Sequence, residues 1–245
     1  MKGYERYFDG VEAVLRKIRD TQAANIEKAA KYVSDAIAAD RVVHVFGAGH
    51  SNLIAEEIFY RAGCPAPVNH VVDISLSGGV GVTKSEFMER LEGVGPVLYN
   101  HIRPAAGDVF IVISNSGRNA APIEMAREAR SHEHPVIAIT SVGYSRSQKS
   151  RHSSGELLLD HADVVLDNCG DFGDVCVDVP GFNRRIGPTS GVAGAYIIHS
   201  VMVQAAFNLQ ENGVEPPVFV SGNRDDGRKL NQSLIDRYWA RIRNW

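Results

Sequence analysis

The chain is poor in the features that mark secreted, metal-binding or membrane proteins. Its three cysteines, Cys64, Cys169 and Cys176, form no CxxC pair, so the sequence indicates neither a zinc site nor a disulfide framework. Lone thiols are typical of a reducing compartment. The charged first twenty residues contain no apolar core of a signal peptide, and no stretch approaches the roughly 18 apolar residues of a membrane span. We therefore expect a cytoplasmic protein that stays out of the membrane.

An excess of charge of one sign is also lacking. The 245 residues include 26 basic and 29 acidic side chains, a net charge of −3, which disfavours a nucleic-acid-binding protein. With 44% hydrophobic and 22% charged residues, the composition is that of an ordinary globular protein. The length is sufficient for one large domain with a substantial core.

Strand-like and helix-like segments alternate along most of the chain. Apolar residues recur with helical spacing through the first forty residues. The strands expected after them are 42–46, 68–72, 109–113, 134–141 and 164–166. Their alternation with helical segments predicts an α/β fold, a three-layer αβα sandwich with a parallel sheet covered on both faces. We expect one domain, with N-terminal helices over 1–40, an α/β core over 41–212 and a C-terminal extension over 213–245.

Polar segments follow three of these strands. GAGHSN follows the first, SNSGRN follows the third, and a stretch rich in serine and arginine follows the fourth. Ligands of open parallel sheets bind beyond the carboxyl ends of the strands, near the point where the strand order reverses. The three segments therefore predict one binding site at that edge of the sheet.

The SNSGRN segment, residues 114–119, lies where a buried strand gives way to a helix. Free amides and the positive end of the helix dipole favour an anion at such a point. Ser114, Asn115 and Ser116 add side-chain donors, and Gly117 allows a close approach of the backbone. A serine that merely caps the helix is the alternative, but one cap does not require two serines and two asparagines. We interpret the segment as a phosphate site.

The GAGHSN segment, residues 47–52, suggests a dinucleotide-binding loop when taken alone. Asp73, 24 residues after Gly49, fits the ribose-binding acid of that fingerprint. The third glycine is missing, however, because Asn52 stands at its position. A dinucleotide would also leave the SNSGRN segment without a role, so we favour the phosphate interpretation.

The pairing of GAGHS with SNSGRN resembles the SIS (sugar isomerase) domain family, over roughly residues 20–212. The resemblance implies a five-stranded parallel sheet of flavodoxin-like order and a phosphosugar ligand. The resemblance implies that Ser114 to Ser116 correspond to the phosphate-binding segment of the family, and that Ser51 corresponds to the ligand-facing serine of its first loop. Asn119 falls where the family usually has threonine or serine. The predicted substrate-binding residues are Gly49, His50, Ser51, Asn52, Ser114, Asn115, Ser116, Gly117 and Asn119.

Glu57 is a candidate base for the chemistry that this resemblance implies. Aldose–ketose isomerisation needs a base that moves a proton between C2 and C1 through an enediol, and an acid for the carbonyl and ring oxygens. Glu57 lies six residues after Ser51 on the expected helix, beside apolar neighbours, although a solvated glutamate is the alternative. In phosphoheptose isomerases this position is a histidine, and their catalytic glutamate falls at Arg61.

His199 interrupts the apolar run 196–207, which is too short for a membrane span and is expected to form a buried helix. An unpaired polar group would be costly there, so the alternative to a functional role is a core histidine with a satisfied hydrogen bond. By resemblance, the position matches an acid–base histidine of phosphoheptose isomerases. We predict Glu57 and His199 as the catalytic residues.

The resemblance leaves three kinds of function open. Besides isomerisation, related SIS proteins cleave an ether of amino-sugar phosphates by β-elimination, and others sense phosphosugars without catalysis. The first forty residues lack the basic clustering of a DNA-binding module. We expect a homodimer or homotetramer with sites at subunit borders, no cofactor, and no metal, because HxxxH and HxxE spacings are absent.

Overall fold

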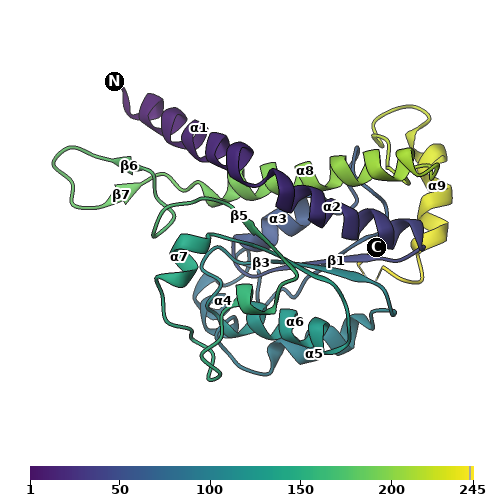
Figure 1. The fold of residues 1–245 in the computed structure, drawn as a ribbon, viewed down its shortest axis with the longest axis horizontal. Coiled ribbons are helices and arrows are strands. Elements are labelled where there is room, and N and C mark those ends of the chain that lie inside the picture. Colours follow the sequence, from purple (N-terminus) through teal and green to yellow (C-terminus); the bar gives the residue numbers. More distant parts are fainter. Residues whose placement is uncertain (243) are drawn as a thin grey trace.

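A parallel sheet forms the middle layer of the structure, a computed structural model that describes residues 1–242 and 244–245 (Figure 1). Its five strands lie in the order β2-β1-β3-β4-β5, and all neighbouring pairs are parallel. The strands are β1 (Val43–Gly47), β2 (Val68–Val71), β3 (Val109–Ile113), β4 (Val136–Thr140) and β5 (Val164–Asp167). The predicted three-layer sandwich with a five-stranded parallel sheet is confirmed.

Helices cover both faces of this sheet (Figure 1). On one face lie α2 (Ala23–Ala38), α3 (Ser51–Glu57) and α8 (Ser190–Glu211), which share a core cluster with Ile111 of β3. On the other face lie α5 (Val94–Ile102) and α6 (Ala120–Ser131), which pack against Phe110 and Val112. Because both faces are covered, every residue of β3 is buried, and the strand is a continuous apolar run.

The long helix α8 belongs to the core. By length and composition alone, it is the one helix of the described chain that is apolar enough to cross a membrane. Ile197, Ile198 and Val201 are fully buried in the cluster that α8 shares with α2. The expected helix over 189–211 is therefore present, and it packs against the protein's own sheet.

An arm extends beyond the sheet on one side of the molecule (Figure 1). It consists of the first half of α1 (Gly3–Thr21) and an antiparallel hairpin of β6 (Val177–Asp178) and β7 (Arg185–Ile186). The Tyr7 hydroxyl donates to the carbonyl oxygen of Pro188 at 2.9 Å and joins the two parts. Sequence analysis did not identify the hairpin, because strands of two residues leave no alternating pattern to detect.

The C-terminal residues are packed on the same body. α9 (Gly227–Tyr238) buries Tyr238 against Val42 and Phe219, in a third core cluster. The Asn231 side chain accepts from the amide of Val220 at 3.0 Å and donates to its carbonyl at 2.9 Å. The segment before α9 is thereby tied to that helix.

Some elements differ from the sequence-based expectation. α3 ends at Glu57, although the apolar pattern predicted a helix as far as Ala62. The chain turns back through Tyr60, with a φ of +48°, and the amide of Gly63 then bonds to the carbonyl of Phe219 at 2.8 Å. The tertiary contact with the C-terminal segment thus ends a helix that local pattern alone would continue.

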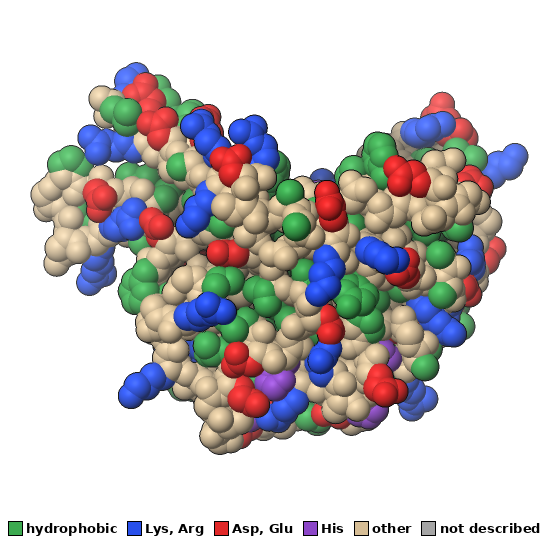
Figure 2. Space-filling view, in the orientation of Figure 1, with side chains coloured by type: hydrophobic (Ala, Val, Ile, Leu, Met, Phe, Trp, Pro, Cys, Tyr) green, Lys and Arg blue, Asp and Glu red, His purple; other side chains and the backbone are tan. Residues whose placement is uncertain are grey.

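Four shorter helical elements complete the fold. α4 (Val82–Met88) and α5 occupy the region for which short helices were expected. α7 (Val142–Arg146) and the 3-10 turn η1 (Leu158–His161) lie in the stretch after β4. On the face of the molecule in Figure 2, basic and acidic side chains are interspersed, in keeping with the net charge of −3.

Candidate functional site

A cleft of about 610 Å³ lies beyond the carboxyl ends of β1 and β3, where the strand order reverses. It is bounded by α1, α3, the start of α8 and the loops that follow the two strands. Four predicted site residues line it, His50, Ser51, Glu57 and Asn115. A second cleft, of about 520 Å³ beside α9, is lined by none of the predicted residues.

The first loop, residues 47–52, owes its shape to glycine. A Cβ on Gly47 would lie 2.5 Å from the backbone carbonyl of Ser51, so only glycine permits this close approach of β1 to α3. Gly49 has a φ of +58°, and its amide donates to the carbonyl of Leu76 at 2.8 Å. The loop therefore turns sharply and presents His50 and Ser51 to the cleft.

Asn52 follows Ser51 directly but faces the opposite way. Its side chain is buried, and its Oδ1 lies 2.8 Å from Nε2 of His70 on β2. Because Oδ1 accepts only, Nε2 of His70 is the donor. Asn52 thus ties α3 to the sheet. It does not line the cleft, so the geometry does not support its predicted contact with a ligand.

The second loop, residues 114–119, presents unpaired donors. The side chain and amide of Ser116 form no hydrogen bond within the described residues, and the amides of Arg118 and Asn119 form none either. Ser116 is half-buried and stands just before the positive end of α6. Free amides at a helix start favour an anion, and the phosphate interpretation of this segment stays a prediction.

Neighbouring residues hold the second loop in this shape. Ser114 Oγ accepts from the amide of Gly117 at 3.2 Å, and Gly117 has a φ of +59°. The Asn115 side chain, which lines the cleft, accepts from Nδ2 of Asn168 at 2.8 Å. Ser141 donates its amide to the carbonyl of Asn115 at 3.0 Å. The loop is therefore supported from the ends of β4 and β5.

Asn119 is a supporting residue rather than a lining one. It is only 6% exposed, and its Nδ2 donates to Oε1 of Glu89 at 2.8 Å while its Oδ1 accepts from Nη1 of Arg151 at 3.0 Å. Burial raises the pKa of Glu89, and the bond from Asn119 acts in the opposite direction. The side-chain amide of Asn119 is thus already engaged through both its nitrogen and its oxygen.

The predicted catalytic residues Glu57 and His199 lie side by side, although 142 positions separate them. Nε2 of His199 is 3.2 Å from Oε1 of Glu57, and Nη1 of Arg61 is 3.2 Å from Oε2. Glu57 lines the cleft, whereas His199 stands behind it, at a depression between α2 and α8. The structure therefore brings the carboxylate to the cleft and the imidazole to the carboxylate.

Cys64 completes this arrangement on the far side of the histidine. Its Sγ lies 4.0 Å from Nδ1 of His199. Burial raises the pKa of the Cys64 thiol, so the sulfur keeps its proton and can donate to Nδ1. This contact favours the tautomer in which Nε2 carries a proton and donates to Glu57.

Asp174 and Tyr7 are among the cleft residues that went unrecognised in the sequence. Asp174 accepts from the amides of Thr189 and Ser190, at 3.0 and 2.9 Å, and thereby caps the start of α8. Tyr7 reaches the cleft from α1. An aspartate that caps a helix 15 positions away, and a tyrosine on a distant helix, leave no local signal.

Among the described residues, no group of three or more histidine, cysteine, aspartate or glutamate side chains is placed to hold a metal ion.

Comparison with known proteins agrees with this fold. Residues 6–141, more than half of the chain, match the SIS-domain family model. The chain belongs to the SIS-domain family, as its two loops predicted. It is 38% identical over 241 residues to a UPF0309 protein of Caldanaerobacter subterraneus, covering 97% of this chain and 98% of that one. A UPF0309 protein of Geobacillus kaustophilus is 39% identical over 239 residues, covering 97% and 94%.

Solved structures show the same fold at low sequence identity. A phosphoheptose isomerase from Francisella tularensis matches with a TM-score of 0.52 at 16% identity, over 84% of this chain and 100% of that one. A phosphoheptose isomerase from Neisseria gonorrhoeae matches with a TM-score of 0.51 at 16% identity, over 82% and 93%. These likenesses support the α/β architecture of the family.

The burial of His70 predicts a specific pH dependence of stability. Burial lowers the pKa of His70 from 6.5 to about 4. Because the folded pKa lies below the unfolded one, the unfolded state binds the proton first, and the free energy of unfolding falls as the pH drops below about 6.5. Linkage predicts a loss of about 2 kcal/mol between pH 7.5 and pH 5.

Urea unfolding of His70→Gln at these two pH values tests the prediction. Glutamine keeps an amide donor for Asn52 but has no ring to titrate, so we expect a shallower loss of stability toward pH 5. His101→Gln, at an exposed position, is the matched control and should keep the wild-type dependence. A His70→Gln slope equal to that of the wild type would contradict the assignment.

Proposed function

We propose that this protein binds a sugar phosphate in the cleft between the two loops and isomerises it between aldose and ketose forms. The observation that supports the proposal most directly is the position of Glu57. Its carboxylate lines the same cleft as Ser51 and Asn115, and it is hydrogen-bonded to His199. In this proposal, Glu57 is the proton acceptor for a sugar held by the second loop.

The phosphate docks at the second loop in this proposal. Ser116 offers a hydroxyl and an amide without partners in the described chain, and the start of α6 adds the positive end of its dipole. Ser51 and His50 approach from the first loop, across the cleft. The sugar then extends from the phosphate toward α3, which carries Glu57.

Glu57 acts as the base that removes the C2 proton, and it returns the proton to C1 of the enediol. His199 and Arg61 each bond to one of its two oxygens, at 3.2 Å, which keeps the carboxylate oriented. His199 is a positioning residue in this arrangement, because it does not line the cleft. Two proteins of similar structure are named phosphoheptose isomerases. This likeness favours isomerisation over the ether cleavage or ligand sensing considered above.

We also propose that copies of this chain associate through the outer face of α8. Val192, Tyr196, Val203 and Phe207 are exposed at spacings that place them on one side of the helix. Exposed apolar side chains gathered on one face mark an interaction surface. Val192 also lines the cleft, so a second copy on this surface would stand at the border of the site.

Replacement of Ser116 by alanine tests the phosphate assignment. A thermal-shift screen of hexose, amino-hexose and heptose phosphates first identifies a stabilising ligand. We expect Ser116→Ala to weaken its binding by about 1–3 kcal/mol, because a hydrogen bond to a charged group is lost. Ser131→Ala, at the far end of α6, is the control and should bind as the wild type does. Unchanged affinity in Ser116→Ala would refute the phosphate site.

Glu57 and His199 are tested by proton exchange. We expect Glu57→Gln to abolish the exchange of the C2 proton with solvent deuterium, since an amide is not a base. His199→Ala should slow the exchange by about 100-fold, because the carboxylate loses its orientation. Both variants should still bind the sugar phosphate.

Glu56→Gln is the matched control for these variants, because Glu56 is exposed on the same helix and should exchange protons normally. Normal turnover in Glu57→Gln would remove the catalytic assignment. Release of an acid without ketose formation would indicate the ether-cleaving alternative. Binding without either reaction in the wild type would indicate a sensor.

The α8 surface is tested by the mass of the protein in solution. We expect the wild type to sediment as a dimer or tetramer and Val203→Glu to shift it toward the monomer, since a buried charge is costly at an interface. Leu230→Glu, at a comparably exposed leucine on α9, is the control and should leave the mass unchanged. A monomeric wild type would contradict the proposal.

A further inference from the structure

The segment after β4, residues 141–157, packs along the second loop. The amide of Arg151 donates to the carbonyl of Arg118 at 2.8 Å, and Nη1 of Arg151 donates to Oδ1 of Asn119 at 3.0 Å. Nη1 of Arg118 donates in turn to Oε1 of Gln148 at 2.9 Å. These bonds place the guanidinium of Arg151 beside the residue that precedes α6.

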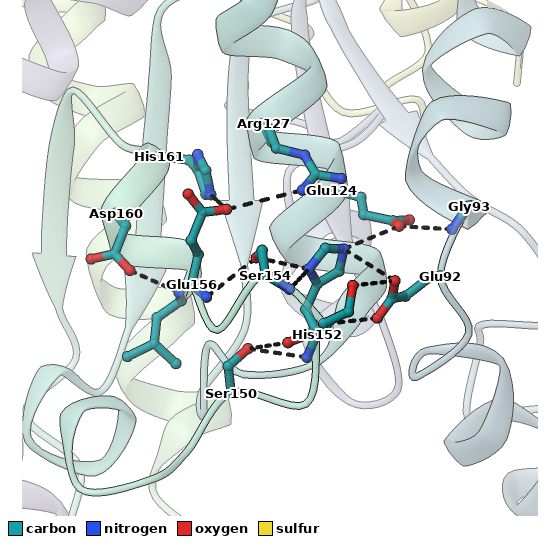
Figure 3. A network of polar contacts seen from close by, with 12 residues as sticks. Glu92, Gly93, Glu124, Arg127, Ser150, His152, Ser154, Glu156, Asp160 and His161 are labelled. Carbon is teal, nitrogen blue, oxygen red and sulfur yellow. Dashed lines mark hydrogen bonds and ion pairs between the residues drawn. The ribbon is translucent and has the colours of Figure 1, made fainter.

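A network of polar contacts anchors the residues that follow Arg151 (Figure 3). His152 is buried, with Nε2 3.4 Å from Oε1 of Glu124 and Nδ1 3.0 Å from the amide of Ser154. Since an amide only donates, Nδ1 is an acceptor and Nε2 carries the proton. Ser153 donates its amide and hydroxyl to Glu92, at 2.6 and 2.7 Å.

Glu124 fixes this network to the core. It is 3% exposed, and its carboxylate accepts from the amides of Gly93 and Gly95 at 2.7 and 3.0 Å. In Figure 3, the ring of His152 lies between Glu124 and Glu92. The backbone next to Arg151 is therefore anchored through His152 to the buried Glu124, although the side chain of Arg151 is exposed.

Positive charge accumulates around the tip of Arg151. Partial desolvation of its guanidinium and the nearby charges of Arg90 and Arg118 lower the pKa of Arg151, whereas Glu89 and Glu86 act in the opposite direction. Glu86 pairs with Arg90, and Glu89 accepts from Asn119. Three guanidinium groups thus face two carboxylates.

Two of these guanidinium groups also keep an unpaired donor. The Nε atoms of Arg90 and Arg118 are buried without a partner in the described part of the chain. Buried donors that lack a partner are uncommon in folded proteins and call for an explanation. An anion bound next to the cluster would offset both the excess charge and the unpaired donors.

We infer that Arg151 is a phosphate-binding residue of this site and confers its preference for phosphorylated sugars over neutral ones. This inference rests on the proposed function, in which the phosphate docks at the second loop. The guanidinium is bonded to the side chain of Asn119. The backbone amide of Asn119 is one of the unpaired donors at the start of α6. A phosphate monoester that accepts from Ser116 and these amides receives a charge-assisted hydrogen bond from Arg151 as well.

The other exposed cations of the segment lack this placement. Arg146 and Lys149 are exposed and form no side-chain hydrogen bond or ion pair within the described residues. Only Arg151 is joined through both its backbone and its side chain to the second loop. Arg146 is therefore a matched control for the loss of one positive charge.

The experiment measures the affinity of inorganic phosphate, and of fructose 6-phosphate, for three variants by calorimetric titration. We expect Arg151→Gln to bind both about 10- to 100-fold more weakly than the wild type, whereas Arg146→Gln binds them equally well. Arg151→Lys should recover part of the lost affinity, because it restores the charge but not the paired donors. The melting temperature should stay unchanged, since the side chain is exposed.

Two results would overturn the inference. One is wild-type affinity in Arg151→Gln, and the other is an Arg151→Lys variant that binds no better than Arg151→Gln. Measurements on Ser116→Ala show whether a negative result excludes only the role of Arg151 or the proposed phosphate site as a whole. Weaker binding in Ser116→Ala together with normal binding in Arg151→Gln would leave the phosphate site in place and exclude Arg151. Normal binding in both variants would exclude the site itself.

Discussion

The register of the parallel sheet is the constraint on which the site depends. Gly47, the last residue of β1, pairs with Ile113, the last residue of β3, and Ile113 pairs with Ile139 of β4. The loops that follow these strands therefore leave the sheet at nearly the same level. Since parallel strands all point their carboxyl ends to one edge, groups from separate segments meet there without a dedicated binding domain.

Local pattern was sufficient to predict this part of the molecule. The strands are short apolar runs bounded by turn residues, and β3 was predicted with its observed limits, Val109–Ile113. The two polar loops were recognisable because serine and glycine stand where each strand meets a helix. The hairpin and the early end of α3 were not predictable, because distant contacts determine them.

Side-chain direction explains why some candidate residues line the cleft and others support it. Successive residues of a helix point about 100° apart, so Ser51 faces the cleft while Asn52, the next residue, bonds to His70. Asn119 likewise turns to Glu89 and Arg151. Residue type in a motif therefore predicts the loop, whereas the phase of the helix that follows decides which side chain reaches a ligand.

Glu57 and His199 differ in the same way, because Glu57 lines the cleft and His199 supports it. Both residues were predicted from the sequence, but their positions in the sequence do not indicate that His199 lies behind Glu57. α3 and α8 pack so closely that a Cβ on Gly194 would lie 2.3 Å from Cδ1 of Ile54, and this proximity brings the two side chains within 3.2 Å. This glycine lets α3 and α8 approach closely, although nothing in the sequence marks it as functional. A larger residue there would force the side chain of Ile54 to move, because its Cδ1 occupies the space that a Cβ would need.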